Sequence, residues 1–230
     1  MLIQQQSSNK TKLGKFLWNF SFVIFWLLTL TTFGISHAKA QSQKYSYQLY
    51  EPNVPNDIKI ILSPSSFKEF HKLFDLISQK DETIIRPIYR KKLKASIFVK
   101  SESNLRRMAG NVRISGDLHD HISKDKGYAS LKVSLKNDHI GHITNFRLVL
   151  AHTKRGKYDV MWGSLMETLG FPVPYRKLVN VDFNGKQYKA IFVESSEKEF
   201  LERYSFRESP IVEMDERSLW ETGSWDKNEE

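Results

Sequence analysis

Residues 110–135 read Gly-Asn-Val-Arg-Ile-Ser-Gly-Asp-Leu-His-Asp-His-Ile-Ser-Lys-Asp-Lys-Gly-Tyr-Ala-Ser-Leu-Lys-Val-Ser-Leu. The stretch predicts a β-hairpin, because Val112 and Ile114 mark a first strand and residues 131–135 alternate apolar with polar side chains. The connection between the strands is crowded with Asp, His and Lys side chains, more than a turn requires. We therefore expect this hairpin to organise the fold and its connection to be a candidate site.

The connection offers two interpretations. Asp117, His119, Asp120 and His121 are residue types that coordinate zinc or manganese. Ligands crowded into one short loop rarely enclose a metal without a distant partner. We therefore favour a polar turn with local hydrogen bonds and assign no metal ligands.

The formal net charge of +9 is unevenly distributed. Residues 1–40 contain four lysines and no acid, and residues 86–107 contain eight basic residues and one acid. Residues 194–230, in contrast, contain twelve acids and five basic residues. This charge dipole suggests orientation near an anionic ligand or membrane, and the absence of interleaved aromatic residues argues against nucleic-acid binding.

The basic segment could form a surface for phosphate or lipid headgroups, or it could be a solvated outer face, which we favour. Its cations are Arg90, Lys91, Lys92, Lys94, Lys100, Arg106 and Arg107. Other chemistry is excluded more firmly. The chain has no cysteine, so it has no disulfides or thiol nucleophile, and it lacks the glycine-rich phosphate loop, the dinucleotide fingerprint and the Gly-x-Ser-x-Gly elbow.

Residues 16–35 are twenty residues without a charge, long enough as a helix to cross a hydrocarbon core of about 30 Å. We expect a retained membrane anchor, and the alternative is a signal peptide cleaved after Ala40, where Ala38-Lys39-Ala40 fits the small-x-small rule. In both cases the preceding lysines place the body outside the cytoplasm, either membrane-anchored or secreted or periplasmic.

The rest of the chain divides by composition into a linker over 41–57, an α+β domain over 58–216 and an acidic, flexible tail over 217–230. Within the domain, the apolar spacing from Phe67 onward predicts a helix from Pro64 to Gln79 with Ser63 as its N-cap. Further elements follow from the same patterns. They are strands over 58–62, 91–100 and 143–151, a turn over 103–108, helices over 158–169 and 196–204, a hairpin over 176–194 that turns at Asn184-Gly185, and a last strand over 210–216.

Several segments, taken in order, resemble the N-terminal half of CotH-like proteins, the atypical kinases of the spore-coat-protein-H type. The matching segments cover parts of residues 90–216, and the most specific are Arg-x-x-Gly-Asp-x-x-Asp-His (Arg113, Gly116, Asp117, Asp120, His121) and the Asn-Gly hairpin that ends at Glu194.

The resemblance implies a kinase-like fold that uses ATP with Mg²⁺ to phosphorylate protein hydroxyls. Lys132 matches the lysine of the family's Ile-Lys-Leu strand and would contact phosphate. Lys126 matches the lysine at the start of the second strand, and Glu194 matches the glutamate that closes a Tyr-Leu-x-Glu strand.

The sequence departs from the family in one respect. It has no Trp-Asp-Phe-Asp metal-binding motif, since Trp225-Asp226 is followed by Lys-Asn, and it offers no match for the catalytic aspartate. We therefore expect an incomplete domain that is inactive alone and assign no catalytic residue.

We predict an α+β fold, a mainly antiparallel sheet with a few flanking helices similar to a kinase N-lobe, preceded by an N-terminal hydrophobic helix. The functional prediction is an exported or membrane-anchored CotH-like protein that resembles the N-terminal half of an atypical protein kinase and is inactive alone, with a protein substrate or an envelope partner as the expected binding partner. The alternative is a non-catalytic envelope protein that binds a partner or an anionic surface through its basic face.

Overall fold

The computed structural model describes residues 50–79, 84–101 and 104–212, all within a compact unit that begins at Gln48. The predicted anchor or signal segment and the acidic tail therefore lie outside the described residues. Among the residues that the structure does describe, no helix has both the length and the apolar character needed to cross a membrane.

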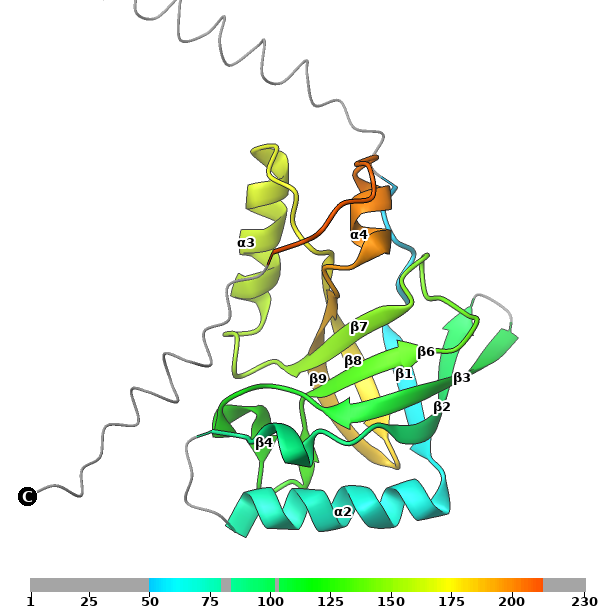
Figure 1. Ribbon diagram of the computed structural model, residues 1–230, viewed down its shortest axis with the longest axis vertical. Coiled ribbons are helices and arrows are strands. Elements are labelled where there is room, and N and C mark those ends of the chain that lie inside the picture. The colour runs from blue at the N-terminus through cyan, green and yellow to red at the C-terminus, as the bar shows by residue number, and fades with distance from the viewer. Residues whose placement is uncertain (1–49, 80–83, 102–103, 213–230) are drawn as a thin grey trace, which may run out of the picture. The chain divides into compact units, whose positions relative to one another are not determined.

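Seven strands close into a barrel with the order β1-β2-β3-β6-β7-β9-β8 (Figure 1). The bounds of these strands are Asp57–Leu62 for β1, Leu93–Ser101 for β2, Asn104–Ile114 for β3, Leu131–Leu135 for β6, Asn145–Leu150 for β7, Arg176–Phe183 for β8 and Lys186–Glu194 for β9. Two short strands, β4 (Ile122–Ser123) and β5 (Tyr128–Ala129), form a separate hairpin in the connection from β3 to β6.

The predicted α+β fold of the kinase N-lobe type is wrong, because the sheet closes on itself. β1 pairs antiparallel with β2 along one edge and parallel with β8 along the other, with Ile58 opposite Val181 and Ile60 opposite Phe183. This parallel pairing joins the two ends of the sheet and leaves no open edge.

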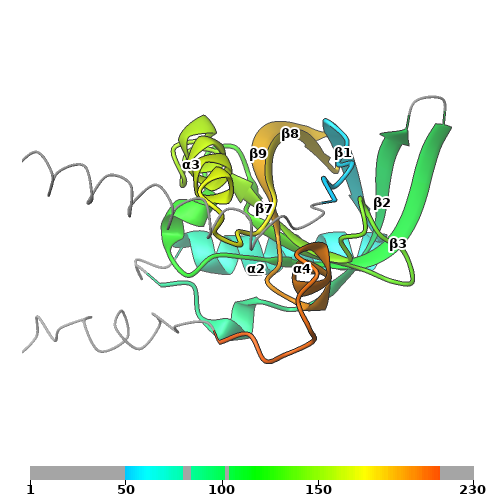
Figure 2. The same ribbon diagram turned by 90° about the horizontal axis from the view of Figure 1, so that it is seen from above.

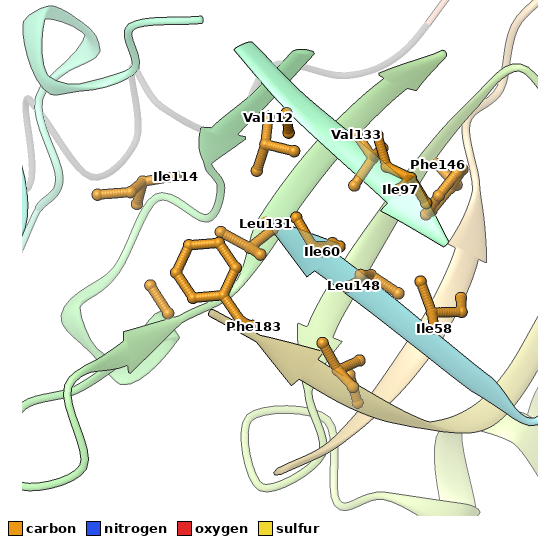
Figure 3. Close-up of a cluster of buried hydrophobic side chains, with 14 of the residues drawn as sticks. Ile58, Ile60, Ile97, Val112, Ile114, Leu131, Val133, Phe146, Leu148 and Phe183 are labelled. Atoms are coloured by element: carbon orange, nitrogen blue, oxygen red, sulfur yellow. The ribbon is translucent and has the colours of Figure 1, made fainter. Parts of the chain in front are cut away.

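The barrel interior is filled by the apolar residues of each alternating strand (Figure 3). In β1, every second side chain is buried, beginning with Ile58. The predicted central hairpin is confirmed: β3 and β6 are antiparallel neighbours, with Val112 opposite Val133 and Ile114 opposite Leu131. Because these four side chains are almost fully buried, the residues between them must face outward.

Helix α2 (Pro64–Gln79) has the predicted bounds and lies across one side of the barrel (Figure 1). The Ser63 hydroxyl accepts a hydrogen bond from the Ser66 amide at 3.3 Å, which confirms the predicted N-cap. Phe70 is buried and its ring lies 4.8 Å from that of Phe183, so α2 seals the barrel with aromatic contacts.

Helices α3 (Lys157–Thr168) and α4 (Lys198–Arg203) confirm the two later helix predictions to within one or two residues. One other prediction is wrong, and a second falls mostly on residues outside those described. The expected turn over 103–108 belongs largely to β3, which begins at Asn104, because that segment pairs with β2 from Ser101 back to Ile97. The described part of the expected last strand, residues 210–212, is irregular, and the rest lies outside the described residues.

Candidate functional site

Three cations lie side by side across the outer wall of the barrel. In the strand register, Arg113 on β3 is opposite Lys132 on β6, and Lys132 is opposite Arg147 on β7. The same row continues through Val193 on β9 to Arg176 on β8. Residues directly opposite one another share a face of the sheet, and like charges in such positions repel. The sequence therefore sets three cations directly opposite one another, an arrangement that costs stability, and places Arg176 at the end of the same row.

The outward direction of the row follows from its neighbours. Lys132 stands between Leu131 and Val133, and Arg147 stands between Phe146 and Leu148; all four of these apolar side chains are completely buried. Strand alternation therefore leaves each cation on the outside of the barrel.

The row lines a pocket of about 530 Å³. Of the residues that the structure describes, six basic side chains and three carboxylates line it, a net charge of +3. The basic residues are Arg90, Arg113, Lys132, Arg147, Lys154 and Arg176, and the acids are Asp117, Asp159 and Glu197. A pocket with this excess of cations favours an anionic ligand.

Each carboxylate of the pocket holds one cation. Arg90 pairs with Asp117 at 2.5 Å, Arg176 with Asp159 at 3.2 Å, and Lys132 Nζ with Glu197 at 3.3 Å. Arg113, Arg147 and Lys154 form no ion pair with any residue that the structure describes. Among the described residues, half of the cations in the pocket are therefore left without a neutralising acid.

The pKa of Arg113 is lowered by burial and also by the neighbouring guanidinium groups of Arg90 and Arg147, although Asp117 opposes the shift. Guanidinium stays protonated in proteins, so the effect is an unfavourable energy of the charged site and not a loss of charge. An anion bound among these three arginines would relieve that repulsion.

His121 borders the pocket and is held firmly in place. Its Nδ1 lies 2.9 Å from the Ser130 hydroxyl, which also accepts a hydrogen bond from the Leu150 amide at 3.0 Å. The ring lies against Gly116, where a Cβ would be 2.1 Å from the imidazole and where φ is +105°. Glycine at position 116 is thus required both by the backbone and by the histidine.

Burial lowers the pKa of His121; Lys154 and Arg147 add to the shift, whereas Asp120 and Asp117 oppose it. The imidazole is therefore neutral at neutral pH. Ser130, His121 and Asp120 resemble a nucleophile–base–acid series only in residue type. Ser130 is completely buried, and Asp120 Oδ1 is 3.9 Å from Nε2 of His121, so no exposed nucleophile results.

Three polar atoms of residues in the pocket lining are buried without a hydrogen-bond partner among the described residues: Nε of Arg90, Nε of Arg176 and Oγ of Ser195. Buried polar groups in native structures are usually satisfied, so each one calls for an explanation. All three atoms are potential donors, although each is covered by the protein and does not face the open space of the pocket.

Of the predicted site residues, Arg113, Gly116, Asp117, His121 and Lys132 lie together in the pocket. Asp120 lies next to it and accepts a hydrogen bond at its carbonyl from Nε2 of His152, 3.0 Å away. Lys126 is exposed in the β4–β5 connection and does not line the pocket.

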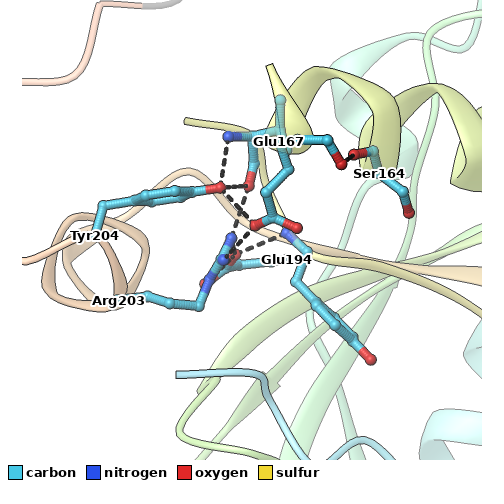
Figure 4. Close-up of polar contacts among 8 residues, drawn as sticks. Ser164, Glu167, Glu194, Arg203 and Tyr204 are labelled. Carbon is cyan, nitrogen blue, oxygen red and sulfur yellow. Dashed lines mark hydrogen bonds and ion pairs between the residues drawn. The ribbon is translucent and has the colours of Figure 1, made fainter. Parts of the chain in front are cut away.

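Glu194 is 1 % exposed and belongs to a buried ionic network next to α3 (Figure 4). It accepts hydrogen bonds from Arg203 Nη2 and from the Tyr175 amide, both at 2.8 Å. Arg203 also contacts Glu167 at 3.1 Å, and Glu167 accepts the Tyr204 hydroxyl at 2.8 Å. Each charged group in this network has a partner of opposite charge, with Arg203 shared between the two carboxylates, and the network links α4, β9 and α3.

Sequence reasoning assigned no role to Arg147, Lys154 or Arg176, and it placed Arg90 in a solvated basic face. A signal for Arg147 was present, because it is a single cation between two apolar strand residues, as Lys132 is. Other cations of the basic segment have other surroundings. Lys91 pairs with Glu69 at 2.7 Å, and Arg107 donates to the Ser96 hydroxyl at 3.0 Å.

Among the described residues, no group of three or more His, Asp or Glu side chains could hold a metal ion. No protein-family model matches the chain, and a search of curated proteins found no match to its sequence.

Proposed function

We propose that the pocket on the outer wall of the barrel binds a phosphate-bearing ligand. The observation that carries this proposal is the row of directly opposed cations, Arg113, Lys132 and Arg147. Like charges in register destabilise a sheet, so their grouping calls for an anion that bridges them. Arginine suits phosphate in particular, because its planar donors match two oxygens at once.

Existing ion pairs would give way when the ligand binds. The Lys132–Glu197 pair is partly exposed, with 29 % and 41 % of the two side chains accessible, so the lysine can exchange its carboxylate for a phosphate at little cost. Arg113 and Arg147 need no such exchange. Arg90, held by Asp117 and by the Ile85 carbonyl at 3.0 Å, would be an oriented donor at the rim.

A nucleotide polyphosphate is the ligand to test first. Arg113 and Lys132 both belong to segments that resemble CotH-like kinases, whose ligand is ATP with Mg²⁺. The proposal concerns binding and not phosphoryl transfer, since the described residues supply no catalytic aspartate for that reaction. The competing function, recognition of an anionic envelope partner without catalysis, would use the same cations.

The test is calorimetric titration of the full chain with ATP, with and without Mg²⁺, and with pyrophosphate and adenosine as comparison ligands. We expect ATP and pyrophosphate to bind and adenosine not to bind. Arg147→Gln and Arg113→Gln should each weaken binding about tenfold or more, because a hydrogen bond to a charged group contributes about 1.5–3 kcal/mol. Binding of neither phosphate compound to the wild-type protein would overturn the proposal.

Lys68→Gln is the matched control. Lys68 is an exposed cation on α2 outside the pocket, so its replacement changes net charge by the same amount without touching the row. Equal loss of affinity in Lys68→Gln and Arg147→Gln would show that general charge, and not the row, attracts the ligand. Binding of pyrophosphate but not ATP would assign the pocket to a smaller phosphorylated group than a nucleotide.

A further inference from the structure

Helix α3 presents an apolar stripe to solvent. The stripe consists of Tyr158, Met161, Trp162, Leu165 and Leu169, which lie three, four, seven and eleven residues after the first, so they share one face of the helix and its C-terminal end. Their exposed fractions run from 48 % to 62 %. Phe171, directly after the helix, is 53 % exposed and extends the same apolar character.

The opposite face of α3 is bound to the barrel by mostly ionic contacts. Asp159 pairs with Arg176, and Glu167 pairs with Arg203. Val160 supplies the apolar contact, against a small cluster on the outer wall of β7 and β9. Figures 1 and 2 both show α3 beside these two strands. Polar residues thus face the protein and apolar residues face outward, the reverse of an ordinary surface helix.

The helix also separates its charges by sign. Its two acids, Asp159 and Glu167, are both held in the inward ion pairs just described. Exposed Arg155 and Lys157 stand at its N-terminal end, where Lys157 Nζ lies 5.8 Å from the ring of Tyr158. The outward surface therefore combines aromatic and aliphatic side chains with cations and carries no carboxylate from the helix.

We propose that this surface, the α3 face, binds anionic lipid membranes. Leu, Trp and Phe on one side with Lys and Arg alongside are the composition of helices that lie in the membrane interface. The twelve residues of α3 make a rod of roughly 18 Å, which can lie in the plane of the headgroups along its whole length. Arg155 and Lys157 border the apolar stripe, and no carboxylate of the helix faces outward, so the surface complements anionic headgroups. We therefore assign a lipid and not a protein partner.

The absence of cysteine from the chain makes a site-specific test simple. A single cysteine is introduced at Leu165 or at Met161, labelled with an environment-sensitive fluorophore, and mixed with vesicles of phosphatidylcholine and phosphatidylserine in a ratio of about 7 to 3. A control cysteine replaces Leu105, which is 67 % exposed on β3. The label reports local insertion, so any binding of the full chain through residues 16–35 does not affect the answer.

We expect the labels at positions 161 and 165 to shift to the blue and to be quenched by spin-labelled acyl chains, and the label at 105 to stay in water. Arg155→Gln with Lys157→Gln should reduce this partitioning roughly tenfold or more, and vesicles of phosphatidylcholine alone should give much less. Labels at 161 and 165 that stay in water would overturn the proposal. A concentration-dependent shift without vesicles would also overturn it, because it would assign the α3 face to a second copy of the chain.

Discussion

Two groups of charged residues in this protein contain the same residue types but have different roles. In the network of Glu194, Arg203 and Glu167, the side chains of Glu194 and Arg203 are buried, and every ionic group has a partner of opposite charge. The row of Arg113, Lys132 and Arg147 lies on the outer wall of the barrel with more cations than acids around it. Matched and buried charges hold elements together, whereas unmatched and accessible charges are available to a ligand. Charge balance and burial, more than residue type, separate structure from binding here.

The largest expected effect is in the buried network. Arg203→Met should lower the free energy of unfolding by about 3–5 kcal/mol, because it leaves Glu194 buried without a counter-ion. Urea unfolding of the full chain, followed by circular dichroism, measures the change. Lys132→Met is the comparison, since the Lys132–Glu197 pair is exposed and should contribute little.

A double variant separates the loss of the ion pair from the loss of packing. Adding Glu194→Gln to Arg203→Met removes the unpaired buried charge and should restore part of the lost stability. Equal destabilisation by Arg203→Met and Lys132→Met would remove the distinction between the two regions. The distinction would also be removed if the double variant lost more unfolding free energy than the two single variants lose together.

A smaller effect on the unfolding free energy is expected at His121, which lines the pocket but is fixed by contacts typical of a core residue. Burial lowers its pKa, so the unfolded chain takes up a proton first as the pH falls. Its contribution to stability is complete above the unfolded pKa of about 6.5 and is lost as the pH falls from there through the folded pKa. Unfolding free energies measured from about pH 8 to about pH 5 should therefore fall more steeply for wild type than for His121→Gln.

His139→Gln is the control for this measurement, because His139 lies outside the pocket lining. Subtracting each variant from wild type cancels the other histidines, which are common to both proteins. Parallel curves for wild type and His121→Gln would mean that the histidine titrates alike in the folded and unfolded chain, and His121 would then belong with the accessible charges of the pocket.

The parts of the fold that could be predicted from the sequence are those fixed by local patterns. The apolar spacing and the Ser63 cap determined α2, and Asn184-Gly185 determined the β8–β9 turn. Closure of the barrel could not be predicted in this way. It depends on the parallel pairing of β1 with β8, two strands more than a hundred residues apart, and no local signal specifies that register.

The candidate site divides in the same manner. Lys132 could be placed on an outer strand face from its apolar neighbours, and the structure puts it in the pocket. Arg147 and Arg176 reach the same row only through strand register and through the return of β8 and β9, which are properties of the folded barrel. Glu194 is the opposite case. From the sequence, a carboxylate at the end of a strand is a reasonable ligand contact, but in the structure it is buried in an ion pair with Arg203.

The smallest expected effect has the opposite sign from that at Arg203. Arg147→Met relieves like-charge repulsion from Lys132 across the sheet, so it should raise the unfolding free energy by about 0.2–1 kcal/mol at low ionic strength. Added salt screens repulsion, so the advantage of the variant should shrink as salt rises. Urea unfolding at two salt concentrations measures both changes.

Destabilisation by Arg147→Met at both concentrations would mean that the row stabilises the fold. A cost in stability could then no longer support the proposal that the row binds a ligand. A gain in unfolding free energy for Arg147→Met that disappears with salt would contrast with the large loss for Arg203→Met. The two arginines would then affect the stability of one domain in opposite directions, because cations surround Arg147 and carboxylates surround Arg203.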